Sequence, residues 1–295
     1  MLTLEHLAAL ANEHAEALEL RVREFDIANR PFRFNSKPAI LGVINLSPGS
    51  WYRESVATGV EAAIERGGVL VAQGADIVDV GAESTLPHME RLDETQQKAR
   101  LLPVVEGLRA ANILVSVETY QPGVTRACLE SGANMLNLTG TVGTEVMYRR
   151  VAEHGAAVII CYVQGSNVRE VDEFDFGADP VGLMEEYFGR QIELAQHCGV
   201  ERILIDPGMG FYYRNLQDST ARVRHQMRTF LNSFRLCRLG FPICHALPHA
   251  FEFFGEEVRC AEPFFAVLAA LGKTHLFRTH EVPRVRAVLR TLQSF

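Results

Sequence analysis

The stretch AILGVI at residues 39–44 decides the fold, because it is the first of a series of short apolar runs that repeat along the chain. Runs of this length, rich in β-branched residues and bounded by turn residues, are typical of buried strands. Seven more follow, at 76–80 (DIVDV), 113–117 (ILVSV), 134–138 (NMLNL), 157–162 (AVIICY), 202–206 (RILID), 242–246 (PICHA) and 274–278 (THLFR). The sequence after Pro38 therefore predicts eight strands.

A stretch of helical character follows each predicted strand, such as GVEAAIERGGVLVAQG at 59–74 and ETQQKARLLPVVEGLRAA at 94–111. Eight β-then-α units in about 250 residues are typical of a (β/α)8 TIM barrel, an α/β fold in which helical crossovers join parallel strands. A doubly wound open sheet is the competing interpretation. The first strand is not followed by a GxGxxG motif, which weakens a dinucleotide-binding fold further.

Residues 1–37 differ from the rest of the chain and predict an N-terminal helical extension. Leu4, Leu7 and Leu10 lie on one side of an amphipathic helix, and the polar connector NRPFRFNSK follows at 29–37. We therefore divide the chain into the extension, 1–37, and the barrel, 38–295.

Composition limits the classes of function. The 295 residues are 47% hydrophobic with a net charge of −7, which argues against broad binding to nucleic acid or to an anionic membrane. The acidic N-terminus does not resemble a signal peptide, and the apolar stretches are too short to span a membrane. Six scattered cysteines without a CxxC pair indicate reduced thiols, and we expect a cytoplasmic protein.

Polar side chains gather at the carboxyl ends of the predicted strands, where barrel enzymes carry their active sites. They are Asn45, Asp79, Glu118, Asn137, Tyr162, Gln164, Asp206, His245, His249, Arg278 and His280. One such residue is more often a turn residue or a helix cap than a ligand group. Convergence from eight strands favours a binding site.

The residue types indicate what this site binds. Glu118, Asn137 and Asp206 supply the donors and acceptors that hold a heterocycle with amide and amidine edges. Arg278 and His280, with Asn45 across the barrel mouth, suit an anion such as a phosphate group.

Six ordered motifs then carry a family resemblance. They are LGVINLSPGSW (41–51), GADIVDVGAESTLP (74–87), VSVETY (115–120), GANMLNLTG (132–140), ILIDPGMGF (203–211) and FRTHEV (277–282). Together they resemble dihydropteroate synthase over most of the chain. The resemblance implies a pterin-binding barrel that joins 6-hydroxymethyl-7,8-dihydropterin pyrophosphate to p-aminobenzoate in folate biosynthesis, with Mg2+ assisting the loss of pyrophosphate.

By position, the resemblance implies a role for each matching residue. Asn45 would lie near the metal and the pyrophosphate, and Thr85 would belong to the second loop. Asn137 and Asp206 would hydrogen-bond the pterin. Arg278 and His280 would bind the leaving pyrophosphate. The resemblance also implies a homodimer.

Several positions depart from the family pattern. Glu118 stands in place of an aspartate that faces the pterin. In the first loop, NLSPGSWYRE (45–54), Gly49 and Arg53 replace two aspartates and Trp51 replaces a phenylalanine. In the second loop, Leu86 replaces an arginine. These loops close over the second substrate and the pyrophosphate in the family, so we expect an altered site there.

The stretch CHALPHAF at 244–251 carries the largest departure. It places His249 near a family arginine and Ala250 at a family lysine that contacts the pterin. The chain has three lysines, at positions 37, 98 and 273, and none is predicted to reach the site. Arg53 and His249 are the candidates for replacing the missing positive charge, although neither reproduces a fixed ammonium group.

Cys244, His245 and His249 also raise the question of a transition-metal site. Two histidines at this spacing share a face only in a helix, and Pro248 argues against one. Cys244 and His245 are adjacent on a strand and point to opposite faces. We do not expect these three residues to form a closed metal site.

Two functions remain open. The first is a divergent dihydropteroate synthase-like transferase that acts on a pterin pyrophosphate-type substrate, with an arylamine or another nucleophile. The second is a non-catalytic or regulatory pterin-binding paralogue. The ring-holding residues mostly match the family and the second-substrate residues mostly do not, so the sequence favours pterin binding over the family's full reaction.

Overall fold

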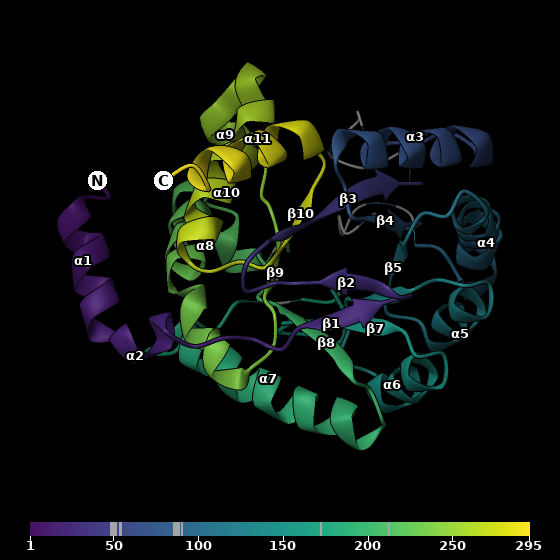
Figure 1. Cartoon of the computed structure of the whole chain (residues 1–295), viewed down its shortest axis with the longest axis horizontal. Coiled ribbons are helices and arrows are strands. Elements are labelled where there is room, and N and C mark those ends of the chain that lie inside the picture. The colour runs from purple at the N-terminus through teal and green to yellow at the C-terminus, as the bar shows by residue number, and fades with distance from the viewer. Residues whose placement is uncertain (48–51, 53–54, 85–88, 90, 172, 212) are drawn as a thin grey trace.

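The chain folds into a barrel of eight parallel strands surrounded by helices (Figure 1). The computed structural model describes residues 1–295 except 48–51, 53–54, 85–88, 90, 172 and 212. The strand order is β8-β7-β6-β5-β4-β3-β10-β9, and a parallel bridge between Ile205 and Ile243 joins the two ends of this series. The strands are β3 (Ala39–Asn45), β4 (Ile77–Gly81), β5 (Val115–Thr119), β6 (Met135–Leu138), β7 (Ala157–Cys161), β8 (Arg202–Asp206), β9 (Cys244–Ala246) and β10 (Leu276–Thr279). The prediction of eight parallel strands is confirmed.

Helices form the outer layer, with their apolar sides against the strands. The longer helices are α3 (Val60–Gln73), α4 (Glu94–Ala110), α5 (Pro122–Glu130), α6 (Thr144–Glu153), α7 (Pro180–His197), α8 (Ser219–Asn232), α10 (Ala261–Leu271) and α11 (Val282–Leu292). Shorter turns are α9 (Phe251–Phe254), η2 (Arg214–Leu216), η3 (Ser233–Leu239) and η4 (Gly255–Cys260). A (β/α)8 barrel is therefore the observed fold.

Local sequence signals set several helix ends. Asp93 begins α4 with a capping box, since its side chain accepts a hydrogen bond from the amide of Gln96 while the Gln96 side chain accepts one from the amide of Asp93. Asp179 caps α7 by accepting from the amide of Val181. Gly74 ends α3 in the left-handed conformation, with φ of 113°.

The N-terminal extension contains strands as well as helices. Helices α1 (Leu4–Glu13) and α2 (Ala15–Leu18) match the helical prediction, but β1 (Phe25–Ile27) and β2 (Arg30–Phe32) then form an antiparallel hairpin. The predicted polar connector is thus wrong in part. Ala28 and Asn29 form the turn with positive φ, a conformation that asparagine tolerates and that suits a two-residue hairpin loop.

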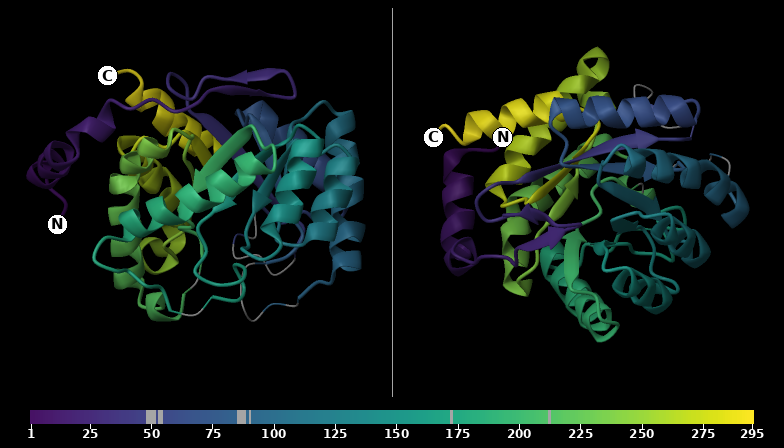
Figure 2. Two further views of the ribbon diagram at one scale, coloured as in Figure 1. Left: turned by 90° about the horizontal axis from the view of Figure 1, so that it is seen from below. Right: turned by 45° about the vertical axis from the view of Figure 1, so that its right-hand side comes forward.

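The hairpin lies at the amino-terminal end of the barrel strands, opposite the predicted site (Figures 1 and 2). Arg202, which begins β8, donates from Nε to the carbonyl oxygen of Asp26 at 2.6 Å. Lys273 donates to the carbonyl oxygens of Leu18 and Leu20 at 2.6 and 2.8 Å, and so holds the end of α2. These contacts leave the opposite end of the barrel for a ligand.

All six cysteines are free thiols, as the sequence predicts, and five of them are buried. The helices in the described part of the chain are all too short or too polar to cross a membrane.

Candidate functional site

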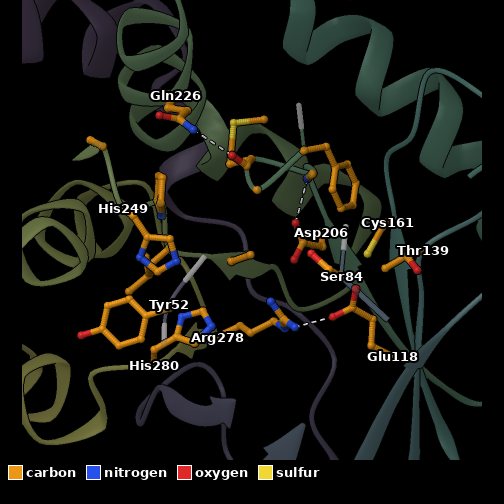
Figure 3. A pocket seen from close by; sticks show the side chains of 18 of the residues that line it. Tyr52, Ser84, Glu118, Thr139, Cys161, Asp206, Gln226, His249, Arg278 and His280 are labelled. Carbon is orange, nitrogen blue, oxygen red and sulfur yellow. Dashed lines mark hydrogen bonds and ion pairs between the residues drawn. The ribbon is translucent and has the colours of Figure 1, made fainter. Parts of the chain in front are cut away.

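A cavity opens at the carboxyl ends of the strands and collects the predicted ligand groups (Figure 3). Side chains that line it and were predicted from the sequence are Asn45, Glu118, Asn137, Asp206, His249, Arg278 and His280. They come from β3, β5, β6, β8, the segment after β9, and β10 with the segment that follows it. The prediction that Asn45, Glu118, Asn137, Asp206 and Arg278 open onto one cavity is confirmed. Three other residues from the strand ends, Tyr162, Gln164 and His245, do not line it.

The guanidinium of Arg278 forms the centre of a buried ion-pair network. Its Nε lies 2.8 Å from Oδ2 of Asp79, and its Nη2 lies 2.5 Å from Oε2 of Glu118. Asp79 is fully buried on β4. The longer glutamate side chain at position 118 reaches the guanidinium across the cavity, as Figure 3 shows. Arg278 therefore faces two carboxylates, not a free anion site.

Three carboxyl groups near one guanidinium make full ionisation costly. Burial raises the pKa of Glu118 to about 7, with the charges of Asp79 and Asp206 adding to the rise and Arg278 opposing it. Burial likewise raises the pKa of Asp206 to about 6, although a hydrogen bond from the amide of Gly208 lowers it. This side of the cavity can hold protons near neutral pH and can accept hydrogen bonds from N–H groups of a ligand.

Asn137 and Asp206 are held in fixed orientations. Asn137 donates from Nδ2 to Oδ2 of Asp79 at 3.1 Å, and its Oδ1 accepts from the thiol of Cys161 at 3.4 Å. Asp206 accepts from the amide of Gly208 at 2.8 Å through Oδ1. Because β5 and β6 are adjacent and β8 lies beyond β7, Glu118, Asn137 and Asp206 form an arc around the cavity.

A second group, the histidine cluster of Tyr52, His249, Glu262 and His280, lies across the cavity from this arc (Figure 3 labels its three rings). The ring of Tyr52 stacks on His249 with centroids 5.0 Å apart and lies 5.0 Å from the ring of His280. Glu262 accepts a hydrogen bond from Nδ1 of His280 at 2.7 Å. Nε2 of His280 lies 3.4 Å from Nδ2 of Asn45.

The surroundings lower the pKa values of two members of this cluster, His249 and Glu262. Burial lowers the pKa of His249 to about 4, and the neighbouring His280 lowers it further. Burial alone would raise the pKa of Glu262, but the charge and hydrogen bond of His280 bring it down to about 2. His249 is therefore neutral at pH 7 and supplies no positive charge to the cavity.

Ala250, which the family resemblance places at a lysine, lines the cavity with φ of 45°. None of the three lysines of the chain lies among the described residues that line the cavity. Lys98 pairs with Glu94 on α4, and Lys273 holds the extension.

Cys244, His245 and His249 do not come together. The ring of His245 packs against Phe230 of α8, with centroids 4.5 Å apart, whereas Cys244 lies beside Asp206. His249 lies between β9 and α9, outside a helix.

Three predicted residues, Thr85, Trp51 and Arg53, lie outside the described residues. Conversely, the cavity includes side chains that the sequence did not single out, among them Tyr52, Met209, Phe211, Arg222 and Gln226. Arg222 and Gln226 are four residues apart and therefore lie on one face of α8. This spacing could have indicated in the sequence that the two side chains point the same way. Glu262 carried no comparable signal, because it reaches the cluster only through the packing of α10.

Comparison with known proteins agrees with this geometry. The family model described as "Pterin binding enzyme" matches residues 41–243. Dihydropteroate synthase from Synechocystis sp. is 28% identical over 272 residues, which cover 88% of this chain and 90% of that protein. The enzyme from Streptococcus pyogenes serotype M6 is 28% identical over 273 residues, covering 88% and 97%.

Solved structures are similar over nearly the whole chain. Xanthomonas albilineans dihydropteroate synthase with 4-aminobenzoic acid superposes with a TM-score of 0.77 at 28% identity, covering 92% of this chain and 98% of that one. Thermus thermophilus dihydropteroate synthase in complex with 6HMPPP gives a TM-score of 0.73 at 26% identity, covering 92% and 100%. The chain therefore belongs to the pterin-binding enzyme family, as a homologue of dihydropteroate synthase.

Proposed function

We propose that this protein binds a reduced pterin in the cavity through Glu118, Asn137 and Asp206. The observation that carries the proposal is the convergence of these three buried or nearly buried hydrogen-bonding groups on one cavity. The homologue from Thermus thermophilus has been solved in complex with 6HMPPP, which supports a ligand of the same class here.

The chemistry of the three groups suits the pyrimidine edge of a pterin. The Asp206 carboxylate accepts hydrogen bonds from the 2-amino group and the adjacent ring N–H, and an asparagine both donates and accepts. Glu118 accepts when ionised and donates when protonated, so a pKa near 7 lets it match either kind of ring atom. A ring bound here replaces water around groups that are otherwise costly to bury.

The reaction we propose is transfer of the pterin-methyl group from a pyrophosphate-type substrate to a nucleophile such as an arylamine. The amine nitrogen forms a bond to the methylene carbon, the carbon–oxygen bond breaks, and pyrophosphate leaves with the electron pair. The nitrogen gives up one proton, which the leaving pyrophosphate or solvent accepts. Asn45, His249 and His280 lie on the side of the cavity away from Asp206 and are proposed to contact the leaving group. Arg278 can bind the pyrophosphate only when its guanidinium releases the Glu118 carboxylate, with which it is paired here.

Magnesium does not fit the described residues well. Magnesium sites use oxygen ligands, usually one or two carboxylates together with substrate phosphates. Two oxygen atoms face the space above Gly81, the amide oxygen of Asn45 and Oε2 of Glu118. The second of these already pairs with Arg278. We therefore derive no step through Mg2+.

A pterin-binding protein without transferase activity is the second candidate. It is favoured by Ala250 at the lysine position and by the neutral state of His249. In either case we expect a small-molecule ligand and no nucleic-acid or membrane partner, and a cytoplasmic homodimer remains a prediction.

The test is to incubate the protein with 6-hydroxymethyl-7,8-dihydropterin pyrophosphate and p-aminobenzoate, and to measure 7,8-dihydropteroate and released pyrophosphate. Formation of both products supports the transferase. Pyrophosphate release without dihydropteroate indicates a different nucleophile. Ligand binding without either product supports the non-catalytic candidate, and absence of binding contradicts both.

A further inference from the structure

Three members of the histidine cluster carry donor atoms that face one another. His249 comes from the segment after β9, Glu262 from the first turn of α10, and His280 from the segment after β10. One ligand atom from each lies within 4.8 Å of the other two. Three separate elements therefore bring two imidazoles and a carboxylate to a single point.

One buried ring nitrogen of this cluster, Nδ1 of His249, lacks a hydrogen-bond partner among the described residues. Oε1 of Glu262 lies 2.7 Å from Nδ1 of His280 and 3.5 Å from Nδ1 of His249. An unsatisfied buried nitrogen that faces a carboxylate oxygen is costly, and a cation between the two atoms would satisfy both.

The carboxylate is rigidly held. Its Oε2 accepts from the Thr279 hydroxyl and from the amides of His280 and Glu281, the latter two at 2.9 and 3.1 Å. These bonds aim Oε1 at the two rings. Glu262 is 1% exposed, and none of its described contacts comes from a lysine or an arginine. The described partners of Oε1 are therefore two imidazoles, which are themselves common metal ligands.

We propose that His249, Glu262 and His280 form a site for a first-row transition-metal ion of the Zn2+ class. Imidazole nitrogen and carboxylate oxygen are ligands for such ions, with bonds near 2.0–2.2 Å. Tetrahedral ligands at that bond length stand roughly 3.4 Å apart. The separation of 3.5 Å between His249 and Glu262 matches this value, and the His280 to Glu262 separation lengthens by about 0.7 Å when the ion displaces the shared proton.

The site keeps an open coordination position. Both histidines line the cavity, so a fourth ligand enters from the cavity side, near Asn45. Three protein ligands with one open position are typical of catalytic zinc sites, and four closed ligands are typical of structural ones. The inference concerns the metal alone and holds whether or not a pterin binds.

The test is titration of chelator-treated protein with Co2+, which reports tetrahedral nitrogen and oxygen coordination through visible d–d absorption, followed by displacement with Zn2+. We expect one ion per chain. His249→Gln and His280→Gln should each weaken Co2+ binding by on the order of 100-fold, since even changes around metal ligands cost 10–100-fold. The matched control is His154→Gln, because His154 is exposed and its ring contacts the carbonyl oxygen of Arg150 at the end of α6. This variant should bind Co2+ like the original protein.

Circular dichroism of each variant before titration separates loss of the site from loss of the fold. Zn2+ should also raise the unfolding temperature of the original protein and of His154→Gln, but not that of folded His249→Gln. Absence of stoichiometric binding overturns the proposal. So does binding that is equal in all variants, since it would show the cluster to be hydrogen-bonded only.

Discussion

Replacing Glu118 by glutamine should change the way in which stability depends on pH. In the folded protein burial raises the pKa of Glu118 to about 7, from an ordinary value of 4.5. A carboxyl group whose pKa is raised on folding is more costly to ionise in the folded protein than in the unfolded chain. The free energy of unfolding is therefore highest below the unfolded pKa of the group and falls as the pH rises through the folded pKa. The window for Glu118 therefore runs from about pH 4.5 to about pH 7.

The size of the effect follows from that window. Each pH unit between the two values is worth about 1.4 kcal/mol, so ionising Glu118 costs the folded protein up to about 3 kcal/mol. Arg278 already offsets part of the burial cost and is included in the raised pKa. Glutamine has the same length but cannot ionise. The free energy of unfolding of Glu118→Gln, relative to the original protein, should thus rise by up to about 3 kcal/mol between pH 4.5 and pH 8.

Urea unfolding followed by circular dichroism at pH 4.5 and pH 8 measures this difference. Comparing two proteins at each pH cancels the contributions of the other titrating groups. Glu145→Gln is the control, because Glu145 is exposed on α6, and its difference from the original protein should stay nearly constant. A Glu118→Gln difference that is equally independent of pH would refute the reasoning about the carboxyl groups.

Three further predictions concern stability. Lys273→Met should remove two hydrogen bonds to the extension and cost about 1–2 kcal/mol, and limited proteolysis should then cleave the first 20 residues faster. Arg169→Met should cost about 3–5 kcal/mol, because it removes the guanidinium that pairs with the buried Glu83 carboxylate. In urea unfolding the loss should be smaller in the double variant with Glu83→Gln. Phe188→Ala should cost about 3–5 kcal/mol by creating a core cavity, and a loss under 1 kcal/mol in the same assay would contradict the packing described.

The barrel could be predicted from the sequence because its signals are local. The run at residues 39–44 is apolar throughout, as expected of a strand buried on both faces, and all eight predicted strands overlap observed ones. The arc of Glu118, Asn137 and Asp206 followed from the same rule, since side chains at the carboxyl ends of barrel strands must converge.

Features that depend on long-range packing could not be predicted. The hairpin of the extension has strands of only three residues, too short for a periodicity signal. The Arg278 to Glu118 ion pair joins residues 160 positions apart, so its geometry appears only in the folded barrel. Glu262 reaches the histidines because the first turn of α10 is hydrogen-bonded to Thr279 at the end of β10 and to the residues that follow, and neither spacing nor residue type indicates that contact.

The central claim is that the arc around Asp206 holds a pterin. Calorimetric titration of 6-hydroxymethyl-7,8-dihydropterin pyrophosphate into the original protein, Asp206→Asn and the exposed control Asp26→Asn tests it most directly. Asparagine keeps the size of the side chain but presents a donor to the ring N–H groups, so we expect binding to weaken by on the order of 100-fold, as for a lost charge-assisted bond with an unpaired donor. Asp26→Asn should bind like the original protein. Equal affinity in all three proteins, or no binding to any of them, would contradict the account.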